Sequence, residues 1–153
     1  MINIFNKKTE LKAFASGKVV AIESINDEVF SNKMMGDGFA IISEKGEVYS
    51  PLDGEVTALF PTQHAIGITT KKGIEFIIHI GINTLEMDNV FCSLVKIGDT
   101  VTKDQILIKY DYDYFCEKNL DKVVVIVFTK PVEFSLSKEK VTKGDIVGLI
   151  KLV

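Results

Sequence analysis

The segment PTQHAIGITTKKGIEFIIHIGINT, residues 61–84, contains both histidines of the chain, His64 and His79. Residues 65–69 and 74–80 are rich in isoleucine and are separated by the polar sequence TKKG, which is the pattern of two antiparallel β-strands joined by a short loop. Because successive side chains of a strand point to opposite faces, His79 is expected to face away from the core. The hairpin therefore places at least one imidazole on the outer face of a sheet.

The length of the loop decides whether the two imidazoles meet. A loop of two or four residues would pair His64 directly with His79, with their Cβ atoms about 5 Å apart. A loop of three residues would shift the register by one position, and a bulge would then be needed to restore this pairing. Since two of the three common loop lengths set them opposite one another, we expect the histidines to be neighbours on one face.

Short segments with high strand propensity make up most of the remaining chain, with glycine, aspartate, asparagine or proline between them. Besides the hairpin, strands are predicted at residues 18–22, 39–42, 55–60, 106–109, 123–128 and 146–152. Single helical turns are expected at residues 84–87 and 112–117, the second with Asp111 or Asp113 as its N-cap. The pattern predicts an all-β fold, a compact β-sandwich or barrel with only short helical turns.

Two pairs of similar segments indicate an internal duplication. Residues 16–22 (SGKVVAI) resemble residues 53–59 (DGEVTAL), and residues 95–99 (VKIGD) resemble residues 141–145 (VTKGD). Recurring glycine–valine turns of an ordinary β-protein are the alternative explanation, but the two pairs together favour duplicated β-units.

The chain has 153 residues, 46% of them hydrophobic and 25% charged, and is long enough for one domain with a sizeable core. Its longest apolar run, residues 123–128, is far shorter than the ~20 residues of a membrane-spanning helix. The N-terminus lacks the features of a signal peptide. Cys92 and Cys116 are too few for a disulfide framework and are expected to be buried thiols in a reducing compartment. We therefore expect a cytoplasmic protein with a flexible segment, residues 1–12, for which weak membrane contact is the alternative, and a single domain, residues 13–153.

The charges restrict the partners of the protein. A net charge of -3 argues against nucleic acid, because phosphate backbones attract basic surfaces. All 18 basic residues are lysines, so no guanidinium group is available to hold a phosphate or carboxylate through two parallel hydrogen bonds. Any phosphate must therefore be held by lysine, histidine, hydroxyl or backbone amide groups.

Two neighbouring imidazoles on a sheet support few kinds of chemistry. They are too few for a zinc site, which takes three or four protein ligands, and the sequence has no H-E-x-x-H or H-x-H pattern of a metallohydrolase. General base catalysis needs a nearby nucleophile, and no glycine-framed serine is present. Nucleophilic catalysis by a histidine that becomes phosphorylated needs only the residues at hand. A purely structural pair of histidines is the remaining alternative.

The hairpin and its surroundings resemble the glucose-type enzyme IIA of the bacterial phosphoenolpyruvate-dependent sugar phosphotransferase system. The resemblance lies first in the motif P-T-x-H-A-x-G-I from Pro61 and in the motif G-x-E-x-x-x-H-I-G-I-x-T from Gly73. Further landmarks follow in the family's usual order at residues 36–41 (GDGFAI), 50–54 (SPLDG) and 95–101 (VKIGDTV). The resemblance thus covers roughly residues 13–152.

The resemblance implies one glucose-type IIA domain over residues 13–153, built as a β-sandwich or barrel on a duplicated hybrid motif. It implies a phosphoryl carrier that accepts phosphoryl from the carrier protein HPr and passes it to a cysteine on the IIB domain of a sugar permease. Neither cofactor nor metal is required, and the membrane is reached only through the permease. By motif position, His79 would be the phosphorylated nucleophile, His64 an accessory imidazole in contact with the phosphoryl group, and Thr62 the residue that orients His64.

Gly81 and Asn83 would form the surroundings of the phosphoryl group, with backbone amides near Gly81 stabilising its charge. The family usually has aspartate at the position of Asn83, so this chain lacks a carboxylate that would tune phosphoryl binding and release. Apolar residues around the histidines are expected to form the partner-docking face. They are Phe60, Ile66 and Ile77. The alternative function is a regulatory protein that binds permeases or metabolic enzymes through the same face with little onward transfer.

Overall fold

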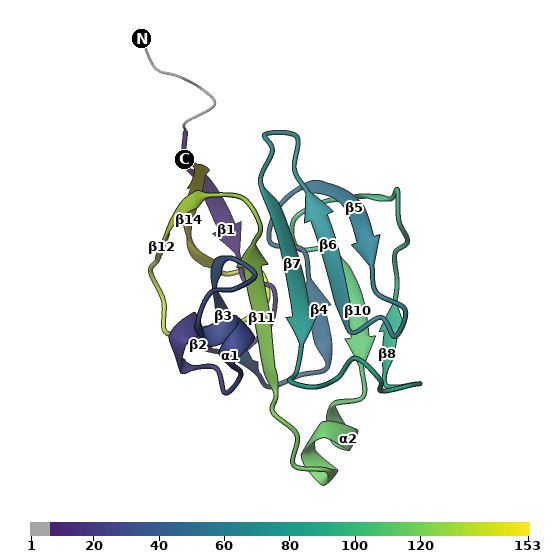
Figure 1. The fold of residues 1–153 in the computed structure, drawn as a ribbon. Coiled ribbons are helices and arrows are strands. Elements are labelled where there is room, and N and C mark those ends of the chain that lie inside the picture. The colour runs from purple at the N-terminus through teal and green to yellow at the C-terminus, as the bar shows by residue number, and fades with distance from the viewer. Residues whose placement is uncertain (1–6) are drawn as a thin grey trace.

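The computed structural model describes residues 7–153, in which antiparallel strands predominate (Figure 1). In chain order the strands are β1 (Thr9–Lys12), β2 (Gly17–Ala21), β3 (Asp37–Ser43), β4 (Glu47–Tyr49), β5 (Gly54–Leu59), β6 (Ala65–Thr69), β7 (Glu75–Ile80), β8 (Phe91–Ser93), β9 (Thr100–Val101), β10 (Ile106–Tyr110), β11 (Val123–Phe128), β12 (Val132–Leu136), β13 (Lys140–Val141) and β14 (Ile146–Leu152). The helices are η2, a 3-10 turn (Ile22–Ser24), α1 (Glu28–Ser31) and α2 (Tyr112–Glu117). The predicted all-β class is confirmed.

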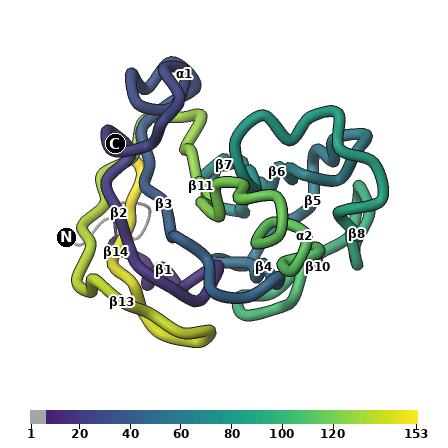
Figure 2. The backbone as a smooth tube through the Cα atoms, turned by 90° about the horizontal axis from the view of Figure 1, so that it is seen from below, coloured from purple at the N-terminus to yellow at the C-terminus, as the bar shows by residue number. Residues whose placement is uncertain are grey.

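The strands form one eight-stranded sheet, β13-β2-β3-β11-β7-β6-β5-β9, and two three-stranded sheets, β1-β14-β12 and β4-β10-β8. In Figure 1, β11 and β7 lie in the middle, and each small sheet lies on its own side of them. Figure 2 shows from below how the backbone curves around an interior. Leu11, Phe76 and Leu107, one from each sheet, are buried in the same core. The architecture is therefore a sandwich whose core is shared by all three sheets.

The order of the strands shows a duplication. The strands form two units with the same arrangement, and members correspond in the order given. The first unit consists of β1, β2, β3, β11, β12, β13 and β14, and the second of β4, β5, β6, β7, β8, β9 and β10. Accordingly, Val141 pairs with Gly17 between β13 and β2 as Val101 pairs with Gly54 between β9 and β5. The predicted duplication is confirmed, and the second unit is inserted whole between β3 and β11 of the first.

One of the two sequence repeats was matched to the wrong segment. Val141 corresponds in space to Val101, so the counterpart of residues 141–145 (VTKGD) is residues 101–105 (VTKDQ), and not residues 95–99. In all three segments the last side chain accepts a hydrogen bond from the backbone N–H three residues earlier. The bonded pairs are Thr142–Asp145, Thr102–Gln105 and Lys96–Asp99. A shared type of turn therefore explains the similarity of residues 95–99.

All predicted strands and the predicted helix at residues 112–117 are present, but the helical turn predicted at residues 84–87 is wrong, because this segment is a turn closed by a hydrogen bond from Met87 N to Thr84 O at 3.2 Å. Strands at residues 65–69, 123–128 and 146–152 have the expected bounds, and the other predicted strands differ by one or two residues at an end. The helix at residues 112–117 is α2, and Asp111 caps it by accepting a hydrogen bond from the backbone N–H of Tyr114. Several strands of two to five residues were not predicted, because segments this short carry little periodicity.

The prediction of a flexible segment over residues 1–12 is wrong for its last four residues. Thr9–Lys12 form β1, which pairs with β14 and buries Leu11 in the core. The folded domain therefore begins by Thr9, because these backbone groups are satisfied by a neighbouring strand. The membrane contact considered for residues 1–12 rests on apolar side chains before Lys7, which lie outside the described residues.

Both cysteines are free thiols, but the expectation that they are buried is wrong, since Cys92 and Cys116 are exposed. Cys92 follows the buried Phe91 on the edge strand β8, and Cys116 follows the buried Phe115 on α2, so each thiol points away from the core. Across residues 7–153, none of the helices has the length and apolar character needed to cross a membrane.

Candidate active site

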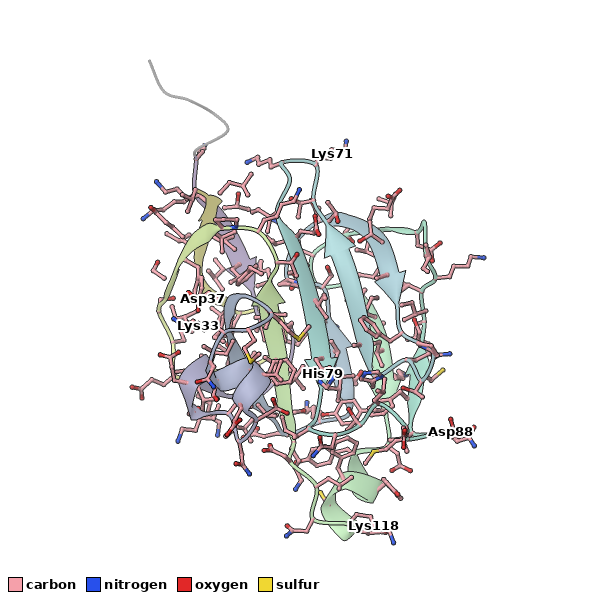
Figure 3. All side chains as sticks on the ribbon, viewed as in Figure 1. Lys33, Asp37, Lys71, His79, Asp88 and Lys118 are labelled. Carbon is pink, nitrogen blue, oxygen red and sulfur yellow. The ribbon has the colours of Figure 1, made fainter. Side chains whose placement is uncertain are left out.

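The hairpin of β6 and β7 closes through a three-residue loop, which Lys71 marks in Figure 3. Thr70 N donates to Ile74 O at 2.8 Å, and Gly73 has a φ of 95°, as the last residue of such a loop requires. His79 is therefore paired with Ala65 rather than with His64. The register expected from a two- or four-residue loop is wrong, because the glycine supplies the positive φ of the three-residue loop.

The two imidazoles nevertheless lie together, with ring centroids 4.9 Å apart in an edge-to-face arrangement. His64 precedes β6, so strand alternation does not fix its side chain. The turn before it is closed by a hydrogen bond from Gln63 N to Phe60 O at 2.7 Å, and Gln63 has a φ of 62°. This turn brings the ring of His64 toward His79, and the expected proximity of the histidines is confirmed by a different route.

One hydrogen bond fixes the tautomer of His79, which lies near the end of β7 (Figure 3). Its Nδ1 is 3.0 Å from Gly81 O, and a carbonyl can only accept, so Nδ1 carries a proton and donates it. The remaining nitrogen, Nε2, therefore holds the lone pair of the neutral ring. Gly81 has a φ of 75°, and a Cβ there would lie 2.7 Å from Thr84 Cγ2, so glycine is needed to aim this carbonyl.

A second set of hydrogen bonds fixes the tautomer of His64. Thr62 Oγ1 lies 2.9 Å from Leu85 O, to which its single proton is donated. The same oxygen is 2.6 Å from His64 Nδ1 and must accept there, so His64 also carries its proton on Nδ1. The structure thus places Thr62 against His64 as the sequence predicted, and both neutral rings have Nε2 as their nucleophilic or proton-accepting atom.

Aromatic rings surround the histidine pair. Phe30 contacts His79 at a centroid distance of 5.1 Å, and Phe60 and Phe91 contact His64 at 5.6 and 6.3 Å, all edge-to-face. His64 is only 2% exposed, whereas His79 is partly exposed. The pair therefore forms a site in which the ring of His79 is accessible and that of His64 supports it from within.

Helix α1 supplies a neighbour that the sequence analysis missed. Asp27 caps α1 by accepting hydrogen bonds from the backbone N–H groups of Val29 and Phe30, and Phe30 then packs beside His79. The sequence Asn-Asp-Glu before Val29 contains this capping signal. Four residues of helix are too few for a recognisable 3.6-residue period, so the signal alone could not place Phe30 at the site.

The three residues predicted to form the docking face differ in their exposure to solvent. Phe60 and Ile77 are partly exposed, and Ile77 lies two residues from His79 on the same face of β7. Ile66 is fully buried opposite Ile78, so its assignment to the docking face is wrong. The three-residue loop is the cause, because a shift of one residue moves every side chain of β6 to the other face. Three exposed apolar residues that the sequence analysis did not name lie next to groups of the site. Val29 precedes Phe30, Met34 N donates to Val29 O, and Leu85 O accepts from Thr62 Oγ1; the three residues are 42, 71 and 59% exposed.

A model of the family described as phosphoenolpyruvate-dependent sugar phosphotransferase system, EIIA 1, matches residues 9–134. The chain belongs to this family. It is an EIIA phosphotransferase component, a phosphoryl carrier in sugar transport, and the resemblance seen in the sequence is confirmed.

Similar proteins support this assignment. The PTS system glucose-specific EIICBA component of Staphylococcus carnosus (strain TM300) is 44% identical over 140 residues, 88% of this chain and 21% of that protein. The glucoside-specific EIICBA component of the same organism is 45% identical over 115 residues, 74% of this chain and 17% of that protein. The chain thus spans about a fifth of the length of these relatives. Glucose permease IIA from Mycoplasma capricolum superimposes with a TM-score of 0.87 at 33% identity, covering 97% of this chain and 99% of that one.

Both histidines of this EIIA are neutral at pH 7. Burial, with a smaller contribution from repulsion by His64, lowers the pKa of His79 from its usual 6.5 to about 4. The hydrogen bond to Gly81 O and the carboxylate of Asp27 oppose this shift without reversing it. Burial also lowers the pKa of His64. The lone pair on His79 Nε2 is therefore available for bond formation under physiological conditions.

The lowered pKa of His79 predicts acid sensitivity. Between pH 6.5 and 4 the unfolded chain binds a proton at this histidine that the folded chain does not, so stability falls as the pH falls. The loss is complete below the folded-state pKa and amounts to roughly 3 kcal/mol. Denaturant unfolding of the wild type and of His79→Gln at pH 7 and pH 4 should show a smaller pH dependence in the variant. Parallel pH dependences would contradict a lowered pKa of His79.

Asn83 and the backbone of Gly81 lie just after His79 in the chain. Asn83 is exposed, with a φ of 57°, in the turn that follows β7. The amide of Gly81 itself donates to Val123 O at 2.7 Å, and Gly81 contributes to the site through its carbonyl, so stabilisation of a phosphoryl group stays a prediction for the backbone amides next to Gly81. Among the described residues, no three histidine, cysteine or carboxylate side chains are grouped as a metal site.

Proposed function

We propose that His79 of this EIIA accepts a phosphoryl group from phospho-HPr and passes it to a cysteine of a IIB domain. The observation that supports this most is the bond from His79 Nδ1 to Gly81 O, which leaves Nε2 as the nucleophilic atom. In the first step, the P–N bond of phospho-HPr breaks as a P–N bond to Nε2 forms. In the second step, this bond breaks as a P–S bond to the cysteine thiolate forms. We place this exchange in the cytoplasm, where the IIB domain belongs to a sugar permease.

His64 is proposed to stabilise the phosphorylated state. A phosphoryl dianion on His79 is an opposite charge a few ångströms from His64, since the ring centroids are 4.9 Å apart. Such a charge raises the pKa of His64 and favours a proton on its Nε2, which then donates a charge-assisted hydrogen bond to phosphoryl oxygen. Thr62 keeps Nδ1 occupied, so the second proton enters at Nε2. This arrangement holds a phosphoryl group without an arginine.

The apolar surface beside the histidines is proposed to dock both partners. It consists of Val29, Met34, Phe60, Ile77 and Leu85. An apolar rim excludes water from the site once a partner is bound, which protects the labile phosphohistidine and strengthens electrostatic interactions within the site. One surface suffices for two partners, because donor and acceptor must each approach the same Nε2 in line with the bond that breaks.

The test is incubation with phosphoenolpyruvate, enzyme I and HPr, followed by mapping of acid-labile phosphate and addition of a IIB domain. Phosphate on His79 that is removed by IIB would support the proposed shuttle. Phosphate that stays on His79 would favour the regulatory alternative, in which this face binds permeases or metabolic enzymes with little onward transfer. Phosphate on another residue, or none, would contradict the assignment of His79.

Asn83→Asp is expected to accelerate transfer from phospho-His79 to IIB by about 3-fold, the effect of one exposed like charge near the phosphoryl group. The carboxylate would repel the phosphoryl dianion and weaken the P–N bond relative to the products. Asparagine and aspartate both tolerate the φ of 57° at this position, so the fold is retained. Quenched-flow measurement of the dephosphorylation rate checks this result. The matched control is Asn119→Asp, another exposed asparagine with positive φ, at the end of α2. Equal rates in Asn83→Asp and wild type would mean that the missing carboxylate is neutral.

A further inference from the structure

The side chain of Gln63, between Thr62 and His64, is bonded to a distant part of the chain. Gln63 Oε1 accepts a hydrogen bond from the backbone N–H of Ser93 in β8 at 2.6 Å. Gln63 itself has a φ of 62°, and a non-glycine residue in this conformation is held there by its contacts. The bond to Ser93 is the contact that joins this turn to another strand.

Ser93 offers a donor that its own sheet does not use. Strand β8 is an edge strand of the sheet β4-β10-β8. Leu94 N donates to Leu107 O of β10, so the preceding N–H, that of Ser93, points away from β10. Gln63 satisfies this edge N–H. The same strand also provides Phe91, whose ring contacts His64. Strand β8 therefore supports both the turn before His64 and the imidazole itself.

We propose that Gln63 is a positioning residue for His64. Its bond to β8 fixes the turn of residues 60–63, so that Thr62 Oγ1 meets His64 Nδ1 and the ring stays beside His79. Thr62 is anchored to Leu85 O on the other side, so the two bonds hold the turn between residues 85 and 93. The effect on catalysis rests on the proposed roles of the two histidines, whereas the effect on the tautomer of His64 does not.

The bond between Gln63 and Ser93 affects which ring nitrogen of His64 carries the proton. The neutral ring of His64 carries its proton on Nδ1 because Thr62 accepts it there, and the tautomer of an imidazole follows the hydrogen bond that it makes. Without the Gln63–Ser93 bond the turn is free to relax from its positive φ, and the short contact between Thr62 and His64 is lost for part of the time. His64 then populates the Nε2–H tautomer as well.

The test uses three variants of Gln63 and one control. Gln63→Ala and Gln63→Gly both remove the acceptor, and the glycine variant also removes any strain of the positive φ. Gln63→Glu retains an acceptor oxygen at the same distance along the side chain. The control is Gln105→Ala, which deletes an equivalent bond from a glutamine Oε1 to the backbone N–H of Thr102 in a turn between β9 and β10.

Nitrogen-15 NMR of the histidine rings in the unphosphorylated protein gives the direct measurement. We expect Gln63→Ala and Gln63→Gly to lose the exclusive Nδ1–H tautomer of His64, while His79 keeps its own through Gly81. Gln63→Glu and Gln105→Ala should retain both tautomers. Transfer of phosphoryl from His79 to IIB should fall about 10-fold in the alanine and glycine variants, as a small misplacement of a catalytic group predicts.

Two outcomes separate this proposal from the proposed function. If Gln63→Ala and Gln63→Gly keep the wild-type tautomer of His64, the positioning role is wrong, whatever the transfer rates. If they lose it, the positioning role is supported even where the wild type proves to carry no phosphate on His79. A wild-type transfer rate in both variants, together with an altered tautomer, would overturn the link between the position of His64 and transfer.

Discussion

Replacing His79 with glutamine is expected to abolish phosphorylation of this EIIA. Glutamine fits the space beside Phe30 and keeps a hydrogen-bond donor for Gly81 O, but it has no lone-pair nitrogen that can form a P–N bond. Loss of the edge-to-face contact with Phe30 costs about 1 kcal/mol, which leaves the fold intact. Incubation with radiolabelled phosphoenolpyruvate, enzyme I and HPr should therefore label the wild type and leave the variant without label.

The control for this experiment is the second histidine. His64→Gln removes an imidazole of the same site while leaving Nε2 of His79 free, so this variant should still be labelled. Circular dichroism of both variants establishes that any loss of label is chemical. Acid-labile phosphate on the His79→Gln variant would contradict the role of His79 as the nucleophile. Loss of label in the His64→Gln variant alone would mean that His64 is the nucleophile.

The fold was predictable because several levels of the sequence agree. Residues 65–69 and 74–80 have high strand propensity, residues 75–80 also alternate between buried and partly exposed side chains, and glycine and aspartate mark the turns. The duplication was visible in residues 16–22 and 53–59, which form the equivalent strands β2 and β5. The similarity of residues 95–99 to residues 141–145 reflects a shared type of turn, since Lys96 and Asp99 are bonded as Thr142 and Asp145 are, and does not mark equivalent positions in the sheet.

The histidine pair was predictable as a pair, but its geometry was not. The register of the hairpin depended on Gly73, whose positive φ favours a three-residue loop, and this single residue decides on which face Ile66 lies. His64 reaches His79 from a turn whose conformation depends on the bond between Gln63 and Ser93. A contact over 30 positions leaves no trace in the local sequence.

The proposed docking face was also only partly predictable from the sequence. Ile77 lies on β7 with His79, and Phe60 lies four residues before His64 in the turn that follows β5, so proximity along the chain identified both. Val29 and Met34 come from α1 and the segment after it, and the contact of Phe30 with His79 is what brings this helix to the site. Tertiary topology therefore supplies the part of the site that motif and periodicity could not.

His64→Gln is expected to accept phosphate from HPr at a rate close to that of the wild type and to pass it to IIB about 100-fold more slowly, as for removal of one charge-stabilising donor. Acceptance depends on the lone pair of His79 Nε2, which the hydrogen bond to Gly81 fixes in the variant as in the wild type. Onward transfer passes through a state in which the phosphoryl group carries its charge between two partners. The protonated imidazole of His64 can neutralise that charge, whereas an amide can only donate a neutral hydrogen bond.

Separate rapid-quench measurements of the two half-reactions distinguish this asymmetry from a general loss of activity. If His64 served only to pack against Phe60 and Phe91, its replacement would slow both half-reactions alike or neither of them. A pH series adds a second criterion, because the wild-type onward rate should fall as the pH rises past the pKa that His64 has beside the phosphoryl group, and the variant should lack this dependence. Efficient onward transfer from His64→Gln would show that the phosphoryl charge is neutralised by the partner, and that the second histidine of this EIIA acts on the position of His79 alone.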